Sequence, residues 1–398
     1  MKKLLLSFCF LLFSVACFAQ WYQMGSGVTN PFFSVYFTAS DTGYVVGFQG
    51  TIRKTINGGT NWPAQTSGTT NMLWSVYFAD ANTGYIVGDF GTILKTINGG
   101  NNWTALTSGI TFNLWSVYFI DANTGYAVGD GGTIIKTVNG GSTWTTQTSG
   151  TTYGISSVYF CNADTGYAVG DGGQIRKTIN GGTWTPQTSG TTNPLTSVYF
   201  TDINTGYAVG DAGTILKTTN GGSNWTPQTS GTTYYLMSVY FTNAYTGYAV
   251  GGNGGVGNGI ILKTINSGLN WTTQSGTTAD GLKSICFSDT STGYTVGFNG
   301  TILKTTNGGV FIEENQLSES PISIFPNPFT TSTTLQTNIN LKSATLSIYN
   351  SLGQEVKTIN NISGKQITLQ RDNLLVGIYF IRLREDDKII ANEKLVIQ

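Results

Sequence analysis

The chain has 398 residues, with 20 Lys and Arg against 20 Asp and Glu, no His, and only 10 % charged residues. Because this charge is sparse and balanced, we expect neither a nucleic acid nor an anionic membrane surface as a partner. The 53 Gly and the 13 % aromatic residues favour many short strands joined by tight turns.

Residues 1–19 are typical of a secretory signal peptide. Two Lys at positions 2 and 3 precede an apolar core, and a small-residue cleavage site ends at position 19. Alternatively, Cys17 is a lipid-anchor cysteine, although Ser14 is a poor residue for a lipoprotein signal. No later apolar run approaches the roughly 20 residues that span a bilayer, so we expect no transmembrane segment in the mature chain.

The chain then repeats itself. The tripeptide Thr-Gly-Tyr recurs with its Gly at 43, 84, 125, 166, 206, 247 and 293, in steps of 41, 41, 41, 40, 41 and 46 residues. The long last step reflects an insertion at 251–259. Seven units of this length indicate a repeat architecture, and this repeat constrains the fold class more strongly than any other feature of the sequence.

The third unit shows the internal pattern of the repeat. Four segments rich in β-forming residues alternate with turn signals such as Asp-Gly-Gly and Asn-Gly-Gly. Four short antiparallel strands per repeat predict the blade of a β-propeller, with a superhelical solenoid as the alternative. The expected strands are 114–119, 126–129, 133–138 and 143–148.

The start of the mature chain completes the count. Residues 21–27, "WYQMGSG", resemble the end of a unit, such as "WTTQTSG" at 144–150, but no unit precedes them. The seventh unit, in turn, lacks a closing Trp strand after Lys304. The sequence therefore predicts an all-β fold in which residues 20–309 form a seven-bladed propeller whose last blade is closed by the N-terminal strand.

The turns before each closing Trp carry a family signal. "TINGGTNW" at 55–62 and "TVNGGSTW" at 137–144 look like Asp-boxes (BNR repeats) with Asn in place of Asp. Together with "SVYF" and "TGYAVGDGG", they resemble the photosystem II stability and assembly-factor family of seven-bladed propellers. This resemblance implies an assembly chaperone as one possible function. Photosynthetic members use basic surface patches, whereas residues 20–309 contain only Arg53 and Arg176 as arginines.

The C-terminal part differs in composition. After a linker at 310–320, residues 321–398 contain "SIFPNPF", "LSIYNSLGQEV", "LLVGIYFIRL" and a final "KLVIQ". These motifs resemble the type A C-terminal sorting domain of the type IX secretion system. The resemblance implies a small β-sandwich, a Gram-negative host, export through the periplasm across the outer membrane, contact with the secretion machinery, and secretion or attachment at the cell surface.

The residues needed for known propeller chemistry are scarce. Sialidases, which also carry Asp-boxes, use an arginine triad and a Tyr–Glu pair, but residues 20–309 contain two Arg and no Glu. A glycosidase with two Asp is the remaining enzymatic alternative. Most propeller Asp occupy repeated turn positions, and for the less regular Asp164 and Asp280 the sequence suggests no second Asp that would complete a catalytic pair. We therefore expect no enzymatic activity.

Metal and cofactor sites are not expected either. With no His, and with Cys161 and Cys286 in different units, neither a Zn or Cu site nor a disulfide framework is predicted. One Lys per unit forms either a basic ring or, as we favour, blade-to-blade contacts. An Asp precedes the second turn in four units, where it either binds a cation or, as we favour, sets the turn: Asp89, Asp130, Asp171 and Asp211.

One position breaks the repeat. Strand alternation sends the residue before the Ser of each first strand away from the core, toward a face or the channel mouth. Phe33, Trp74 and Trp115 would then lie side by side as a binding patch for a sugar or a peptide, unless they pack between blades. Phe112, Tyr153, Tyr234 and Tyr235 would extend it. The seven residues are Phe33, Trp74, Trp115, Ser156, Thr196, Met237 and Lys283.

The sequence thus predicts an exported, non-enzymatic propeller without cofactor that binds a surface protein or a glycan. The alternatives are a polysaccharide-active glycoside hydrolase that uses propeller Asp residues, and an assembly chaperone by family resemblance.

Overall fold

The computed structural model describes residues 21–253, 257–274, 280–309, 322–350, 354–386 and 388–398. The predicted signal peptide and linker lie outside the described residues. The chain divides into two compact units, residues 1–310 and 311–398. None of the described segments forms a helix with the length and hydrophobicity needed to cross a lipid bilayer.

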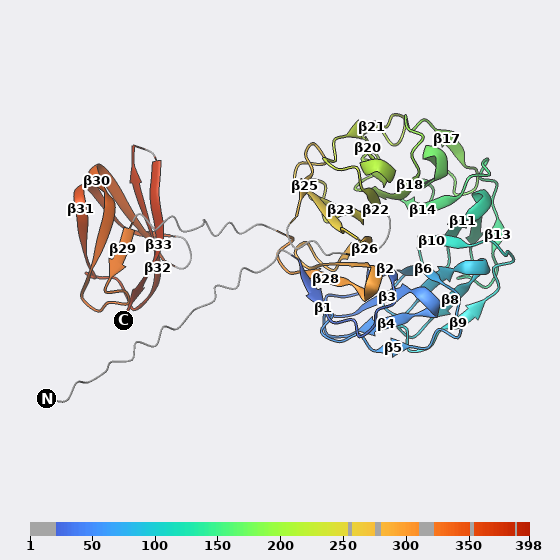
Figure 1. Cartoon of the computed structure of the whole chain (residues 1–398), viewed down its shortest axis with the longest axis horizontal. Coiled ribbons are helices and arrows are strands. Elements are labelled where there is room, and N and C mark those ends of the chain that lie inside the picture. Colours follow the sequence, from blue (N-terminus) through green and yellow to red (C-terminus); the bar gives the residue numbers. More distant parts are fainter. Residues whose placement is uncertain (1–20, 254–256, 275–279, 310–321, 351–353, 387) are drawn as a thin grey trace. The chain divides into compact units, whose positions relative to one another are not determined.

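The first unit is a ring of seven four-stranded antiparallel sheets arranged radially about one axis (Figure 1). This confirms the predicted all-β, seven-bladed propeller. Blades 1 to 3 are β2 (Phe32–Phe37), β3 (Gly43–Gly47), β4 (Ile52–Thr55) and β5 (Ala64–Gln65); β6 (Leu73–Phe78), β7 (Gly84–Gly88), β8 (Ile93–Thr96) and β9 (Thr104–Leu106); and β10 (Leu114–Phe119), β11 (Gly125–Gly129), β12 (Ile134–Thr137) and β13 (Thr145–Thr146).

The remaining blades repeat the same order of strands, and blade 7 takes its fourth strand from the beginning of the chain. Blades 4 to 7 are β14 (Ile155–Phe160), β15 (Gly166–Gly170), β16 (Gln174–Thr178) and β17 (Thr185–Gln187); β18 (Leu195–Phe200), β19 (Gly206–Gly210), β20 (Ile215–Thr218) and β21 (Thr226–Gln228); β22 (Tyr235–Phe241), β23 (Gly247–Gly252), β24 (Ile260–Thr264) and β25 (Thr272–Thr273); and β26 (Leu282–Phe287), β27 (Gly293–Gly297), β28 (Ile302–Thr305) and β1 (Tyr22–Met24).

The ring closes as predicted. Strand β1 pairs antiparallel with β28, with Tyr22 opposite Lys304 and Met24 opposite Ile302. Trp21, immediately before β1, is only 1 % exposed and belongs to the core between blades 6 and 7. The two ends of the propeller chain therefore share one sheet, which leaves no unpaired gap in the ring.

A circle of serine hydroxyls joins the innermost strands. The hydroxyl of Ser34 accepts a hydrogen bond from the backbone N–H of Val76 in the next blade, at 3.2 Å. The same contact is made in every blade, and Ser284 of blade 7 accepts from Val35 of blade 1. Each bond satisfies a backbone donor at a blade boundary, so the Ser of the "SVYF" motif fixes how neighbouring blades meet. The remaining acceptors are Ser75, Ser116, Ser157, Ser197 and Ser238.

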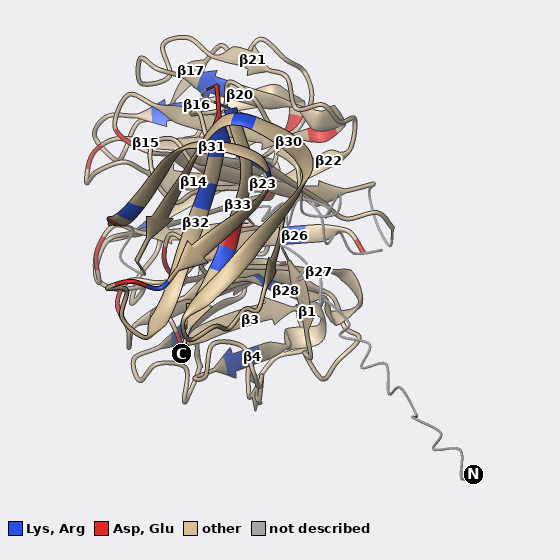
Figure 2. Ribbon diagram, turned by 90° about the vertical axis from the view of Figure 1, so that its left-hand side faces the viewer, with Lys and Arg blue, Asp and Glu red and all other residues tan. Residues whose placement is uncertain are grey.

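The repeated Lys also joins blades, in agreement with the structural interpretation of that residue. Lys263 and Tyr248 of blade 6 both donate to the carbonyl oxygen of Gly308 in the turn of blade 7, at 2.6 Å each. The ammonium lies 5.5 Å from the centre of the Tyr248 ring, and burial lowers the pKa of Lys263. Figure 2 shows such basic residues on strands, for example on β4, and many acidic residues in loops.

The Asp-box turns hold together without an Asp. In blade 1, the hydroxyl of Thr55 donates to the side-chain oxygen of Asn57 and accepts from the N–H of Gly59. Asn57 in turn accepts from the N–H of Asn61. An amide oxygen is thus sufficient for the clasp, because the turn requires only an acceptor of the right length.

Two local expectations differ from the structure. The fourth strands are only two or three residues long, and β13 covers Thr145–Thr146 instead of 143–148 because only Ile135 and Lys136 pair with it. The Asp-Gly-Gly segment forms a short 3₁₀ turn in which Gly131 has φ +62°. Equivalent turns are η1 (Phe48–Gly50), η2 (Asp89–Gly91), η3 (Asp130–Gly132), η4 (Asp171–Gly173), η5 (Asp211–Gly213) and η6 (Phe298–Gly300).

The C-terminal unit is a β domain with its own core. Its strands pair in the order β29-β30-β32-β33, and β31 pairs with β30. The long strand β30 takes part in both halves of the sheet, because it pairs with β29 near its start and with β32 near its end. Residues from both halves form one apolar cluster. The strands are β29 (Ile322–Phe325), β30 (Ser332–Tyr349), β31 (Glu355–Gln370), β32 (Gly377–Glu385) and β33 (Lys388–Ile397).

Candidate functional site

The residue that breaks the repeat lies in a β-bulge in every blade. The register between the first two strands shifts around this position, for example between Leu114 and Ser116 in blade 3. A bulge places an extra residue in one strand and redirects its side chain. The bulge, and not simple alternation, is therefore what turns this side chain out of the blade. The same shift occurs in the other six blades.

All seven bulge residues line a single cavity of about 350 Å³, here called the mouth cavity. The structure thus brings Phe33, Trp74 and Trp115 together, on one side of it. The complete lining is Phe33, Trp74, Trp115, Asp130, Gly154, Ser156, Asp171, Thr196, Met237 and Lys283.

The three aromatic bulge residues form a stack. The rings of Phe33 and Trp74 lie 4.2 Å apart with an interplanar angle of 27°, and those of Trp74 and Trp115 lie 4.6 Å apart at 43°. All three side chains are half-buried. The rings therefore pack on one another across blade boundaries and at the same time face the cavity, which combines both interpretations of the pattern.

The indole N–H groups of this stack are tied to the acidic turns. Trp74 donates to Asp89 at 2.7 Å, and Trp115 donates to Asp130 at 2.6 Å. Each bond links the bulge on the first strand to the turn that follows the second strand of the same blade. The carboxylates of blades 2 and 3 thereby orient the two indoles, so these Asp have a role besides starting a turn.

Blades 4 and 5 lack this arrangement. Their bulge residues are Ser156 and Thr196. The Thr196 hydroxyl donates a hydrogen bond to the backbone carbonyl of Leu236. Within the described part of the chain, no hydrogen bond or ion pair reaches the carboxylates of Asp171 and Asp211. Burial, and to a smaller extent the neighbouring Asp171, raise the pKa of Asp211. The two groups are close enough to repel each other.

The opposite side of the cavity carries a cation. Lys283, the bulge residue of blade 7, places its ammonium 4.9 Å from the centre of the Phe298 ring. Burial lowers the pKa of Lys283. The mouth cavity is therefore polarised, with a cation at blade 7, carboxylates at blades 3 and 4, and an aromatic stack at blades 1 to 3.

The other aromatic residues proposed for the rim lie apart from the stack. Phe112 and Tyr153 are 54 % and 55 % exposed and line a separate shallow groove between blades 3 and 4. The Tyr153 ring lies over Gly172, where an added Cβ would come within 3.4 Å of it. Tyr234 is half-buried against the core between blades 5 and 6, and Tyr235 is 41 % exposed on β22.

The sequence predicts only part of the polar side of the mouth cavity. Ser156, Thr196 and Lys283 share the variable position of the stack and line the cavity. Asp130 and Asp171 also line it, although the sequence pattern indicates for them only a turn or a cation site. The spacing of 15 residues between each bulge Trp and its Asp was a usable signal, since it is the same in blades 2 and 3. Among the described residues, no three His, Cys, Asp or Glu side chains gather where they would hold a metal ion.

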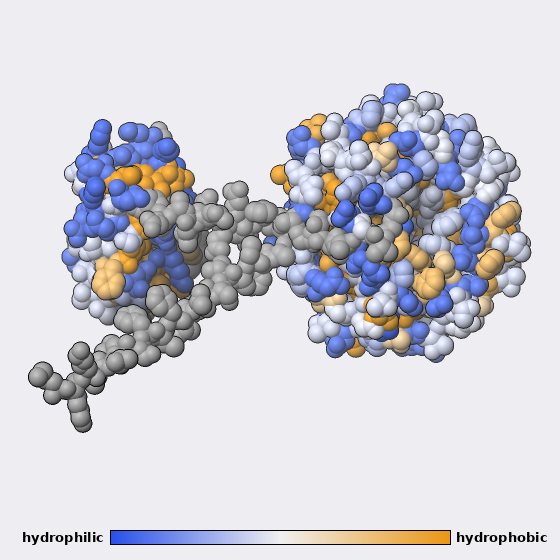
Figure 3. All heavy atoms as spheres, viewed as in Figure 1, coloured by the Kyte–Doolittle hydropathy of each residue, from blue (hydrophilic) through white to orange (hydrophobic). Residues whose placement is uncertain are grey.

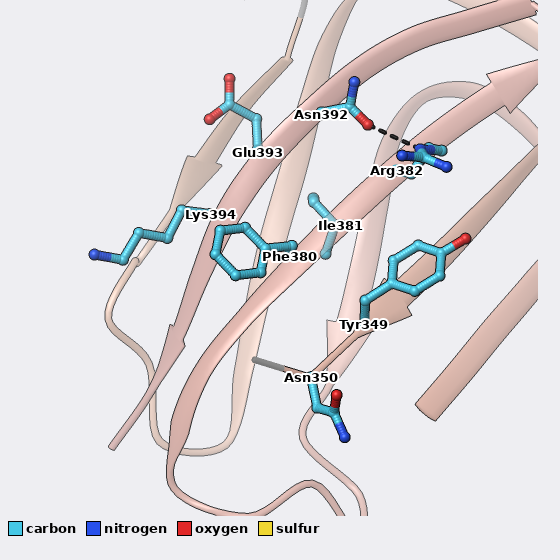
Figure 4. A pocket seen from close by; sticks show the side chains of 8 residues that line it. All are labelled: Tyr349, Asn350, Phe380, Ile381, Arg382, Asn392, Glu393 and Lys394. Carbon is cyan, nitrogen blue, oxygen red and sulfur yellow. Dashed lines mark hydrogen bonds between the residues drawn. The ribbon is translucent and has the colours of Figure 1, made fainter. Parts of the chain in front are cut away.

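The C-terminal unit has a groove of its own, of about 660 Å³. Its lining comes from β30, β32, β33 and Asn350, which follows β30. Figure 4 shows these side chains, with Arg382 hydrogen-bonded to Asn392 at 3.0 Å. The guanidinium of Arg382 also lies 5.5 Å from the centre of the Tyr349 ring. Figure 3 shows apolar side chains exposed on this unit, and Phe380 in the groove is 50 % exposed.

Comparison with known proteins agrees with this architecture. A family model described as photosynthesis system II assembly factor YCF48 matches residues 13–110, 64–148 and 177–275, which is more than half of the chain. A second model, described as a secretion system C-terminal sorting domain, matches residues 323–398. No curated protein sequence matches significantly.

Three solved structures share the fold. "YCF48 bound to D1 peptide" is 19 % identical with a TM-score of 0.62, and covers 73 % of this chain and 96 % of its own. YCF48 from Cyanidioschyzon merolae is 20 % identical with a TM-score of 0.61, over 72 % and 99 %. The GH74 enzyme of Niastella koreensis is 16 % identical with a TM-score of 0.60, over 80 % and 59 %.

The C-terminal match indicates export by the type IX secretion system, to the cell surface or the medium, and contact with that machinery. The repeated blades, the closure by Trp21 and the family match lead to one assignment. The chain belongs to the photosynthesis system II assembly factor YCF48 family of seven-bladed propellers, and it carries a secretion-system sorting domain at its C-terminus.

Proposed function

We propose that this protein is an exported, non-enzymatic propeller that binds a surface protein or a glycan through its mouth cavity. The observation that carries the proposal is the stack of Phe33, Trp74 and Trp115, which lines an open cavity although its rings are large enough to be core residues. Half-buried aromatic rings beside unpaired polar groups are typical of ligand sites. The peptide bound by one YCF48 structure supports a binding role for this fold.

The roles of the propeller Asp residues support a non-enzymatic protein. Asp80 and Asp121 accept two backbone N–H bonds each in the turns before Thr-Gly-Tyr. Asp89 and Asp130 accept the indole N–H groups of the stack. The backbone hydrogen bonds lower the pKa of Asp80 and of Asp121, and the contacts hold all four carboxylates in structural roles.

A binding screen with stack variants tests the proposal. The purified protein is applied to arrays of host surface proteins and glycans, and Trp74→Ala/Trp115→Ala should abolish the binding found. A Trp74→Phe/Trp115→Phe variant keeps two rings but removes both indole donors, so it should retain part of the affinity. Tyr245→Ala is the matched control, because Tyr245 is 67 % exposed in a turn on the opposite face. Unchanged binding by a folded double variant contradicts the proposal.

One observation favours a second function, a glycoside hydrolase. Asp171 and Asp211 form a pair of neighbouring carboxyl groups, and the pKa of Asp211 is raised by burial. A carboxyl group that is protonated more readily than usual and lies near a second carboxyl group is what glycosidic hydrolysis needs in its general acid. Turnover on a panel of polysaccharides, abolished separately by Asp171→Asn and Asp211→Asn, would establish this function. An assembly role like that of the photosynthetic relatives would require retention in the periplasm, which the sorting domain does not favour.

A further inference from the structure

We propose that the mouth cavity receives the side chain of an arginine from a partner polypeptide, in a slot between Trp115 of blade 3 and Asp171 of blade 4. This inference rests on the proposed function and names the chemistry of its ligand.

The slot exists because the stack ends at Trp115. On the side of blade 2, Trp115 packs against Trp74. On the side of blade 4, the equivalent bulge residue is Ser156, and the neighbouring Gly154 carries no side chain. An added Cβ at Gly154 would come within 2.8 Å of a carboxylate oxygen of Asp171, so this carboxylate lies directly beside the space that Gly154 leaves open. Trp115, Gly154, Ser156 and Asp171 all line the same cavity.

Comparison of the blades shows what the slot lacks. In blades 2 and 3, a planar nitrogen donor, the indole of the bulge Trp, satisfies the Asp of the turn. In blade 4, the turn Asp is present but the donor is replaced by the small Ser156. A ligand that supplies a flat N–H donor beside Trp115 would therefore continue the stack by one place and pair with Asp171.

The charges around the slot select a cation. Asp130 and Asp171 line the cavity, and Asp211 lies next to Asp171. Lys283 lines the same cavity at blade 7, which keeps cations away from that side and favours them at blades 3 and 4. A positive group here relieves the repulsion between Asp171 and Asp211, which gives the ligand a source of affinity that a neutral group lacks.

Arginine fits better than a sugar because of its charge. The inner faces of Phe33, Trp74 and Trp115 are covered by one another, so either ligand would stack on the free face of Trp115, but a neutral sugar does not balance the charge of the carboxylates. A guanidinium needs one free aromatic face and a carboxylate at its edge, which are the two features of this slot. The cavity of 350 Å³ is at the small end of ligand pockets, so it suits one side chain.

The test uses two short peptides that differ by one charge. The full-length exported protein is titrated with acetyl-Gly-Arg-Gly-amide and with the same peptide containing citrulline, which has the same shape but no charge. Binding is followed by calorimetry and by the indole N–H signals in NMR spectra. We expect the arginine peptide to bind at least tenfold more tightly, to shift the Trp115 signal, and to weaken as salt is raised.

Two variants locate the site, and one serves as the control. Asp171→Asn should weaken the arginine peptide at least fivefold. Ser156→Trp should abolish its binding without lowering the melting temperature, because the new indole would occupy the slot and donate to Asp171 as in blades 2 and 3. Asp164→Asn changes an exposed Asp of the same blade on the opposite face, so it should have no effect.

The outcomes separate this inference from the proposed function. Equal affinity for the arginine and citrulline peptides, or unchanged arginine binding in both Asp171→Asn and Ser156→Trp, overturns the inference. If a partner from the binding screen still requires Trp74 and Trp115 in that case, the proposed function remains. If the partner is a glycan whose binding survives Asp171→Asn, the arginine slot is also wrong.

Discussion

Trp21 meets the ring of Phe287 edge to face, with the ring centres 6.0 Å apart and an interplanar angle of 87°. Trp62 makes the same contact with Phe37 inside blade 1, at 6.1 Å and 89°. The first described residue of the chain thus occupies in blade 7 the place that a closing Trp occupies in each other blade. The propeller is held as a ring by a contact between its two chain ends.

Trp21→Ala should therefore destabilise the whole propeller. Because the indole is 1 % exposed, its loss leaves a cavity and should cost about 3–5 kcal/mol of unfolding free energy. Denaturant unfolding measures the change. Tyr22→Ala, at the exposed residue that follows Trp21, is the control and should cost less than about 1 kcal/mol. Equal stabilities of the two variants would show that the ring does not depend on this closure.

The serine circle predicts a similar but smaller effect. Ser75→Ala removes the acceptor of the Val117 backbone N–H at a blade boundary. An unsatisfied backbone donor costs about 1–3 kcal/mol, so the melting temperature should fall by several degrees. Ser40→Ala, at an exposed turn, should leave it unchanged. If both variants melt alike, the hydroxyls do not hold the blades together.

Asp121 predicts a loss of stability in acid. Backbone hydrogen bonds from Asn123 and Thr124 lower the pKa of Asp121 below its usual value. A carboxyl group whose pKa is lower in the folded state stabilises the fold above its unfolded pKa, and this contribution is lost as pH falls through the folded pKa. Asp121→Ala should be less stable than the parent at pH 7, and the difference should shrink below about pH 3. Thermal melts across pH measure it, and a difference independent of pH would contradict the assignment.

For Asp211 we expect the opposite effect of pH on stability. Its pKa is raised by burial and by Asp171, so its charged form is disfavoured in the folded state. This penalty is absent below the unfolded pKa and complete above the folded pKa. Asp211→Asn should therefore raise the melting temperature at pH 7 but not near pH 3. A variant that is less stable at pH 7 would mean that the carboxylate has a stabilising partner.

The sorting domain predicts where the protein goes. Deletion of residues 311–398 should stop delivery to the cell surface and the medium, and the propeller should accumulate inside the cell. Immunoblots of cell fractions measure this distribution. The propeller has its own closed ring and core, so it should remain folded and resist protease in the cell extract. Normal delivery of the truncated protein would show that the export signal lies elsewhere.

Much of the fold follows from the sequence. Counting the Trp strands predicted that residues 21–27 complete blade 7, and the pairing of Tyr22 with Lys304 confirms it. Such counting succeeds because each repeat forms one sheet from local hairpins, and a missing strand leaves an edge that some other segment must cover. The sorting domain can be predicted from the sequence equally well, since its motifs are continuous in the chain.

Only part of the candidate site can be predicted from the sequence. The sequence determined which residues break the repeat, and therefore that Phe33, Trp74 and Trp115 differ from the core. The tertiary structure decided what they face, because a β-bulge between Leu114 and Ser116 turns Trp115 toward the axis. A bulge arises from the pairing of two strands, so the amino-acid sequence of either strand alone gives little indication of it. Only closure of the ring then brings Trp115, Asp171 and Lys283, from three different blades, to the same cavity.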